Sequence, residues 1–303
     1  MLEENFMAML RGESQRWSTK RIVKYLIKRF FVYLIVIGGA LMFAMPLYLM
    51  IITSLKSSDM LYERPFKWIP TEWHFENYLK AWNAFPFTLY LRNTLFITIT
   101  SIIGAVISTS MAAYAFSRLK FPAKKLFFVL VIGAMLLPKE VTFIPTYLIW
   151  WKLGMVNTFV PLIAPSWLAR GLSKIFLLRQ FFRTIPLELE DAAKIDGASA
   201  FKRYTKIIVP LSKPAIGVVL IFEFITNWNS FVGPLIYLND PKLYTLNVGL
   251  NMFKDAYAEQ FSHMPNMNYF MAIATLIVIP ILIIFVFLQK YFVEGIQLSG
   301  IKR

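Results

Sequence analysis

The sequence contains no cysteine and only two histidines, His74 and His263, among its 303 residues. Without cysteine, a disulfide framework and thiolate chemistry are excluded, and two isolated histidines are too few for a histidine metal cluster. The phosphate-binding pattern G-x-x-x-x-G-K-[ST], the pattern G-x-G-x-x-G and the pattern G-x-S-x-G are also missing. We therefore expect no catalytic residue, no metal and no cofactor on this chain, and we do not expect it to be an enzyme.

Charge is scarce as well. Only 16% of the residues are charged, whereas soluble domains carry about a quarter, and 57% are hydrophobic. The apolar residues form blocks of roughly 18 to 25 residues, the length of a helix that crosses a bilayer. The sequence therefore predicts an all-α polytopic membrane protein with the lipid bilayer as a partner. The net charge of +15 does not indicate nucleic acid, because the basic residues cluster beside apolar blocks, as a topology bias requires.

Six membrane spans are predicted within a transmembrane domain at 30–293. A basic segment at 1–29 precedes them and a short tail at 294–303 follows, and the positive-inside rule places both termini in the cytoplasm. Pro138 and Pro145 are expected to break the third span. The spans are expected at about 30–55, 89–117, 126–150, 159–182, 215–238 and 269–292, with long extracytoplasmic loops at 56–88 and 239–268.

A polar stretch at 184–214 lies between two apolar blocks. Pro186 suits the first turn of a helix, and acidic residues follow where the helix dipole favours them. Gly197 can adopt a left-handed conformation and end this helix, and Ser199 can cap a second one. Pro210 and Pro214 then mark the return to the membrane. The residues alone are compatible with a simple linker or with a docking element on the cytoplasmic side.

The stretch contains D-A-A-x3-G-x9-I-x-V-P, beginning at Asp191. It resembles the E-A-A-x3-G-x9-I-x-L-P signature of binding-protein-dependent ABC importer permeases, with Asp191 for the usual Glu and Val209 for the usual Leu. The run from Phe176 to Gly197, and Asn227-Trp228-Asn229, are similar to the carbohydrate branch, which includes the shorter membrane subunit of the maltose transporter. The likeness extends from about residue 30 to the end of the chain.

The resemblance implies a type-1 ABC importer permease fold and a mechanism of alternating access. It implies a second homologous permease subunit, a dimer of ATP-binding subunits that carries ATP and Mg, and an extracytoplasmic solute-binding protein. The location implied is the bacterial cytoplasmic (inner) membrane. The residues expected to couple the chain to the ATPase are Glu190, Asp191, Ala192, Ala193, Gly197, Ala198 and Phe201.

Ionisable residues inside spans are costly and mark candidate solute pathways. Glu223, Asn227 and Ser230 are spaced to share a helix face in the fifth span, with Trp228 beside them and a break expected at Gly233-Pro234. The same residues could instead form a polar seam between helices.

Arg170 and Lys174 are predicted to share a face of the fourth span. Glu223 or Glu140 could neutralise them within the protein. Alternatively, they could attract an anionic solute, such as an alginate-type oligouronate or a glycerol-phosphate diester. A passive channel or secondary transporter, and a membrane enzyme or scaffold, are the competing classes; a channel or secondary transporter would need no docking element, and the missing catalytic motifs disfavour an enzyme.

Overall fold

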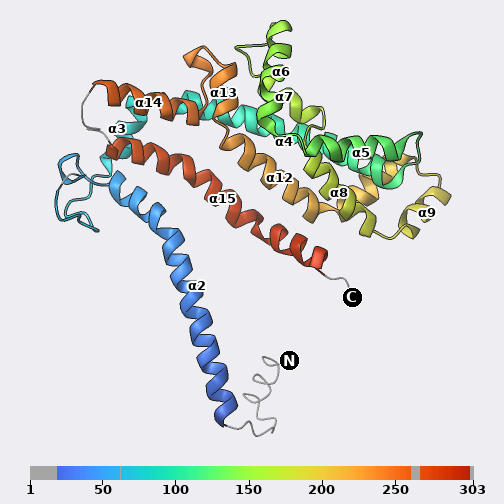
Figure 1. Cartoon of the computed structure of the whole chain (residues 1–303), viewed down its shortest axis with the longest axis horizontal. Coiled ribbons are helices and arrows are strands. Elements are labelled where there is room, and N and C mark those ends of the chain that lie inside the picture. Colours follow the sequence, from blue (N-terminus) through green and yellow to red (C-terminus); the bar gives the residue numbers. More distant parts are fainter. Residues whose placement is uncertain (1–18, 62, 261–266, 301–303) are drawn as a thin grey trace.

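The computed structural model describes residues 19–61, 63–260 and 267–300, and these form helices and connecting turns without a strand. Figure 1 shows an elongated bundle with one long helix that extends away from it. The elements in order are α2 (Thr19–Ser54), η1 (Asp59–Leu61), α3 (Glu76–Ala84), α4 (Phe87–Arg118), α5 (Lys124–Met135), α6 (Lys139–Lys152), α7 (Val160–Trp167), α8 (Leu172–Thr184), α9 (Glu188–Ile195), α10 (Ala200–Arg203), η2 (Tyr204–Ile208), α11 (Val209–Leu211), α12 (Lys213–Trp228), α13 (Val232–Tyr237), η3 (Pro241–Leu243), α14 (Leu246–Gln260) and α15 (Met267–Gly300).

Three of these helices are long and apolar enough to cross a membrane within the described residues: Val23–Ser54, Phe87–Arg118 and Met267–Phe287. Two bent pairs would raise the number to five. The pair of α5 and α6 is bent by 105°, and the pair formed by Ala200–Leu211 and α12 is bent by 81°. The helical membrane-protein class is confirmed. The count of six spans and the orientation of the termini stay predictions.

Several predicted spans differ from the helices observed. The third span breaks at Pro138, which precedes α6, but Pro145 lies inside α6 and does not end it. The fourth span is two helices, because the chain between α7 and α8 turns with Ala169 in a left-handed conformation. The fifth span ends at Trp228, before Gly233-Pro234, which lie within the short helix α13. At the two ends, α2 begins at Thr19 and α15 continues to Gly300, so helix covers parts of both predicted flanking segments.

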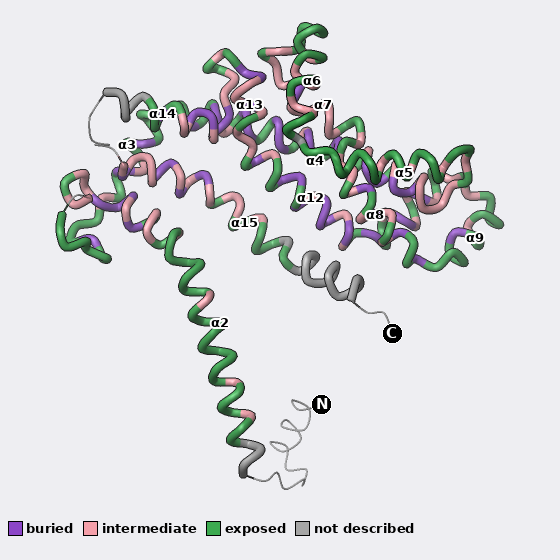
Figure 2. Tube along the Cα trace, viewed as in Figure 1, coloured by how far each residue is buried: buried purple, intermediate pink, exposed green. Residues whose placement is uncertain are grey.

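Helix α4 lies at the centre of the bundle and contacts α7, α8, α12 and α14. The buried side of α4 includes small and hydroxyl-bearing residues, which allow close approach of neighbouring helices. Thr109 and Ser110 each return a hydrogen bond to the preceding turn, so their hydroxyls are satisfied without water. The purple segments along α4, α8 and α12 in Figure 2 mark this buried interior.

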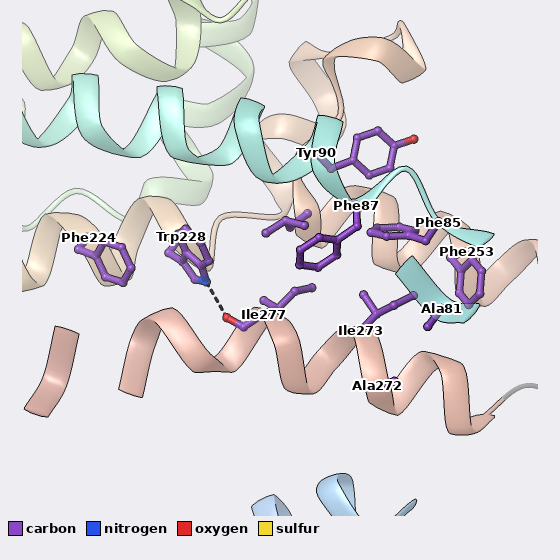
Figure 3. Packing of buried hydrophobic residues seen from close by; sticks show 11 residues of the cluster. Ala81, Phe85, Phe87, Tyr90, Phe224, Trp228, Phe253, Ala272, Ile273 and Ile277 are labelled. Carbon is purple, nitrogen blue, oxygen red and sulfur yellow. Dashed lines mark hydrogen bonds between the residues drawn. The ribbon is translucent and has the colours of Figure 1, made fainter. Parts of the chain in front are cut away.

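Two hydrophobic clusters fill the bundle, one at each end of α4. One includes Tyr114, Phe182 and Ile208 and joins α4 to α8 and η2. The other includes Phe85, Phe224 and Trp228 and joins α3, α4, α12, α14 and α15 (Figure 3). The Trp228 indole donates a hydrogen bond to the Ile277 carbonyl, 3.0 Å away. This bond satisfies the one polar atom of a ring that is 1% exposed.

Most of α2 extends away from the other described helices. Only its C-terminal end approaches the bundle, where it contacts α15 (Figure 1). The rest of the helix is exposed along its length although it is apolar, including Ile35, Met42 and Phe43 (Figure 2). An apolar helix exposed on every side needs an apolar surrounding, which lipid or another membrane subunit supplies.

Gly104 permits the close contact between α4 and α7. A Cβ at this position would overlap the Trp167 ring, whereas a Cβ at Gly133 in α5 would meet no atom within 4 Å. We expect Gly104→Val to destabilise the chain by about 1–3 kcal/mol through overpacking. Thermal unfolding of the purified protein in detergent measures the effect. Gly133→Val is the matched control, since it makes the same substitution in an open helix position, and equal melting temperatures for the two variants would contradict this packing.

Candidate coupling element and solute pathway

The polar stretch folds as predicted around Gly197. This residue has a φ of 76° and follows α9, and its N–H donates to Lys194 O while Ala198 N–H donates to Ala193 O. These two bonds satisfy carbonyls at the end of α9 and fix the turn. Ser199 then caps α10, because its hydroxyl accepts a hydrogen bond from Lys202 N–H. Pro186 differs slightly from the prediction, since α9 begins two residues later, at Glu188.

In the second half of the stretch, the helix continues past Pro210 instead of ending there. The helix widens to a π turn at η2, where Val209 N–H bonds to Tyr204 O. Proline has no N–H to donate and its ring crowds the preceding turn, and a wider turn accommodates both defects. The chain bends only afterwards, between α11 and α12.

Glu190 points into the protein, not outward. Glu190 is only 6% exposed, and its carboxylate lies 2.9 Å from Arg118 Nε and 3.8 Å from Arg203 Nε. The Arg118 contact is an ion pair by distance, without the geometry of a hydrogen bond. The Tyr114 hydroxyl donates a hydrogen bond of 3.0 Å to the other carboxylate oxygen. The two cations neutralise the buried carboxylate and the hydroxyl donates to one of its oxygens, so the carboxylate fixes the groups around it.

Arg118 extends this network to α8. Its Nη2 donates hydrogen bonds of 2.5 Å to the carbonyls of Phe182 and Ile185, at the end of α8. One side chain at the end of α4 therefore holds both the end of α8 and, through Glu190, the start of α9. The sequence shows Arg118 only as one of several basic residues after an apolar block, so nothing in it singled out this contact.

The other coupling candidates lie on the outside of the element. Asp191, Ala192, Gly197 and Phe201 are exposed, and Ala193 and Ala198 are partly buried. Two apolar side chains are strongly exposed beside them, Ile195 at 86% and Phe201 at 65%. In Figure 1 the element projects at one end of the bundle. It thus has a buried polar anchor and an exposed surface of small and apolar residues.

A second buried ion pair connects α8 to α12. Lys174 pairs with Glu223, whose carboxylate also accepts hydrogen bonds from Ser166 Oγ at 2.7 Å and from Asn227 Nδ2 at 3.0 Å. The expectation that Glu223 could neutralise Lys174 within the protein is met, and Ser166 is an additional partner that the sequence did not indicate. Because Ser166 lies on α7, Lys174 on α8 and Asn227 on α12, the carboxylate connects these three helices.

A small cavity of about 50 Å³ lies next to this network. Two of the predicted pathway residues line it, Asn227 and Ser230, although Ser230 follows the end of α12. The volume is enough for one or a few water molecules and too small for a sugar. The other lining residues are Thr94, Ile97, Leu162, Pro234 and Thr245.

Two pathway candidates lie elsewhere. Trp228 does not line the cavity, because its ring is part of the hydrophobic core described above (Figure 3). Arg170 does not share a helix face with Lys174, because it lies in the turn before α8, where it is exposed. The ring of Tyr237 in α13 stacks on Tyr147 at a centroid distance of 5.8 Å.

Comparison with known families assigns the fold. Residues 104–297, almost two thirds of the chain, match the model of the family described as "Binding-protein-dependent transport system inner membrane component". The chain belongs to this family. It is therefore a membrane permease component, and the resemblance found in its signature is confirmed.

Individual relatives of this permease cover most of its length. The probable ABC transporter permease protein YurM of Bacillus subtilis is 34% identical, over 90% of this chain and 86% of its own. The sn-glycerol-3-phosphate transport system permease protein UgpE of Brucella abortus is 32% identical, over 87% and 94%. The arabinooligosaccharides transport system permease protein AraQ of Halalkalibacterium halodurans is 30% identical, over 70% and 74%.

A solved structure has the same fold. It is a chain from the crystal structure of a bacterial ABC transporter involved in the import of the acidic polysaccharide alginate. The TM-score is 0.77, with 22% identity, covering 92% of the permease and all of the other chain. The ABC importer permease fold expected from the sequence is thereby confirmed, whereas the count of six spans stays a prediction.

The Glu190 anchor can be tested by removing its charge alone. Glu190→Gln leaves Arg118 and Arg203 without their buried counter-ion, so we expect a loss of about 3–5 kcal/mol in stability. Asp191→Asn is the matched control, because Asp191 is exposed and has no ion pair among the described residues, and we expect a change within about 0.5 kcal/mol. Thermal unfolding in detergent measures both variants. An unchanged melting temperature for Glu190→Gln would contradict the anchoring role.

Proposed function

We propose that this permease is the non-catalytic membrane subunit of an ATP-driven importer in the bacterial cytoplasmic membrane, and that α9 and α10 dock on a separate ATP-binding subunit. The observation that carries the proposal is the combination found in the element from Glu188 to Arg203. It is anchored by a buried carboxylate on one side and exposes small and apolar residues on the other. Exposed apolar side chains at a polar end of a membrane protein favour a protein partner.

The anchor gives the docking element a way to transmit movement. A force on α9 acts through Glu190 on Arg118 and Arg203, and through Arg118 on the ends of α4 and α8. Packed helices move as rigid bodies, so a displacement of α9 would shift α4 and α8 together. Alternating access requires such a linkage between the docking surface and the helices that enclose the solute.

The remaining partners follow from the same proposal. ATP and Mg are held by the dimer of ATP-binding subunits, a solute-binding protein delivers the solute from outside, and a second permease subunit completes the pathway. The exposed apolar length of α2 is available to lipid and to that second subunit. The cavity beside Asn227 is too small for a sugar, which agrees with a pathway that opens between two subunits and not within one.

For the solute we propose a carbohydrate, specifically an oligosaccharide. The arabinooligosaccharide permease among the relatives supports this class. An acidic sugar such as an alginate-type oligouronate is favoured by Arg170, an exposed cation in the turn before α8. Lys174 supports it less, because Glu223 already neutralises it. A glycerol-phosphate diester is the alternative, favoured by the glycerol-phosphate permeases among the relatives.

The docking proposal predicts a loss of coupling when charge enters the exposed surface. Ile195→Glu places a carboxylate on a side chain that is 86% exposed, so we expect normal insertion but a fall of at least about tenfold in solute-stimulated ATPase activity. Gly197→Asp should have the same effect, because it adds a charge and also places a side chain on a left-handed backbone that favours glycine. Leu153→Glu, an exposed leucine after α6, is the matched control and should leave coupling intact. Wild-type coupling in both Ile195→Glu and Gly197→Asp would refute the docking surface.

The charge of the solute can be tested at Arg170. Arg170→Ala removes an exposed cation, so we expect transport of an acidic oligosaccharide to require about tenfold more solute, with a neutral oligosaccharide unaffected. Arg92→Ala, an exposed arginine on α4, makes the same change in charge and is the control. Uptake assays in proteoliposomes with both solutes measure the effect. Equal losses for acidic and neutral solutes would contradict charge recognition.

A further inference from the structure

Three cations converge where the start of α5 meets α8. Lys124 opens α5, and Arg179 and Arg183 lie one turn apart on α8. Their charges act on one another: both arginines repel the Lys124 ammonium, and Arg183 also repels the Arg179 guanidinium. The cluster lies beside the end of α4 and therefore close to the end of the bundle that carries α9 (Figure 1).

Two of these cations are held in place and cannot simply separate. Arg179 Nε donates to the Phe116 carbonyl at 3.3 Å, and its guanidinium lies 3.9 Å from the centre of the Phe128 ring. Lys124 Nζ donates to the Leu119 carbonyl at 2.7 Å. Both groups keep further N–H donors, because a guanidinium has five and an ammonium three.

No carboxylate neutralises the cluster within the part of the chain that the structure describes. None of the ion pairs among those residues includes Lys124, Arg179 or Arg183, and Glu190 is already shared by Arg118 and Arg203. Lys124 also stands at the positive end of the α5 dipole, which adds to the repulsion. A topology bias explains basic residues near a span, but it does not require three of them to converge from two helices.

The surroundings of the cluster are apolar and accessible. Leu126, Phe127 and Leu130 on α5 are all more than half exposed. Beneath them, Phe128 packs against Phe116 and Phe176 at centroid distances of 5.6 and 6.5 Å. A ligand for this place therefore needs an anionic group for the cations and an apolar part for the exposed face of α5.

We propose that Lys124, Arg179 and Arg183 bind the phosphate group of an anionic phospholipid whose acyl chains lie along α5. Arginine and lysine donors on a phosphate form charge-assisted hydrogen bonds, and the phosphate removes the repulsion among the three cations. The position at the junction of an apolar face and a charged end matches the amphipathic structure of such a lipid. This lipid site is independent of the docking of α9 and of the solute pathway.

The test uses the full-length chain, with any subunits that co-purify, in nanodiscs of phosphatidylcholine with and without phosphatidylglycerol. We expect phosphatidylglycerol to raise the melting temperature of the wild type, and Arg183→Gln to reduce its apparent affinity for this lipid about tenfold. Arg183 suits the test because it is exposed and its change should leave the fold intact. Arg179→Gln should reduce the affinity further. Lys206→Gln and Lys213→Gln remove exposed charges from the neighbouring stretch and should keep wild-type lipid binding.

The responses of these variants to phosphatidylglycerol, and of the wild type to inorganic phosphate, decide the proposal. It is supported if the stabilisation by phosphatidylglycerol falls in Arg183→Gln and Arg179→Gln and persists in the two lysine controls. It is overturned if all four variants respond to phosphatidylglycerol like the wild type, or if the controls lose the response equally. Inorganic phosphate, added to phosphatidylcholine nanodiscs, must not reproduce the stabilisation; if it does so to the same extent, the site binds soluble phosphate and the lipid assignment is wrong.

Discussion

The cost of a buried carboxylate determines how the polar stretch of this permease is held. Glu190 could not be buried alone, because removal of its charge from water costs several kcal/mol. Its carboxylate is neutralised by Arg118 and Arg203 and accepts a hydrogen bond from the Tyr114 hydroxyl. Arg118 and Tyr114 lie on α4, and Arg203 lies on α10. The requirement to keep these groups together fixes α9 against the bundle. A docking element that must transmit movement needs such a fixed base.

The same constraint acts in the interior of the bundle. Glu223 is paired with Lys174 and bonded by Ser166 and Asn227, so its position holds α7, α8 and α12 relative to one another. Buried polar groups with a complete set of partners specify one arrangement of helices, which apolar contacts alone would specify less strictly. Two ion pairs, one near the coupling element and one beside the cavity, thereby define the frame within which any rearrangement during transport occurs.

Local features of the polar stretch were predictable because each depends on few neighbours. Gly197 ends α9 in a left-handed conformation and Ser199 caps α10, as expected from their residue types. Proline was less informative. Pro138 marks the break before α6, whereas Pro145 and Pro210 remain inside helices, and the π turn before Pro210 accommodates its missing N–H. The break after Trp228 had no comparable marker, and it came before the expected Gly233-Pro234.

The sequence by itself determined the membrane class, the family signature and the position of the polar stretch, because hydrophobic length and short motifs are local properties of the chain. It also identified Glu190, Glu223 and Lys174 as residues of interest. Only the tertiary structure decided their roles: Glu190 faces inward, Glu223 pairs with Lys174, and Trp228 packs in the core. The physical reason is that the partner of a buried charge is chosen by helix packing, and Arg118 lies 72 residues from Glu190 in the chain.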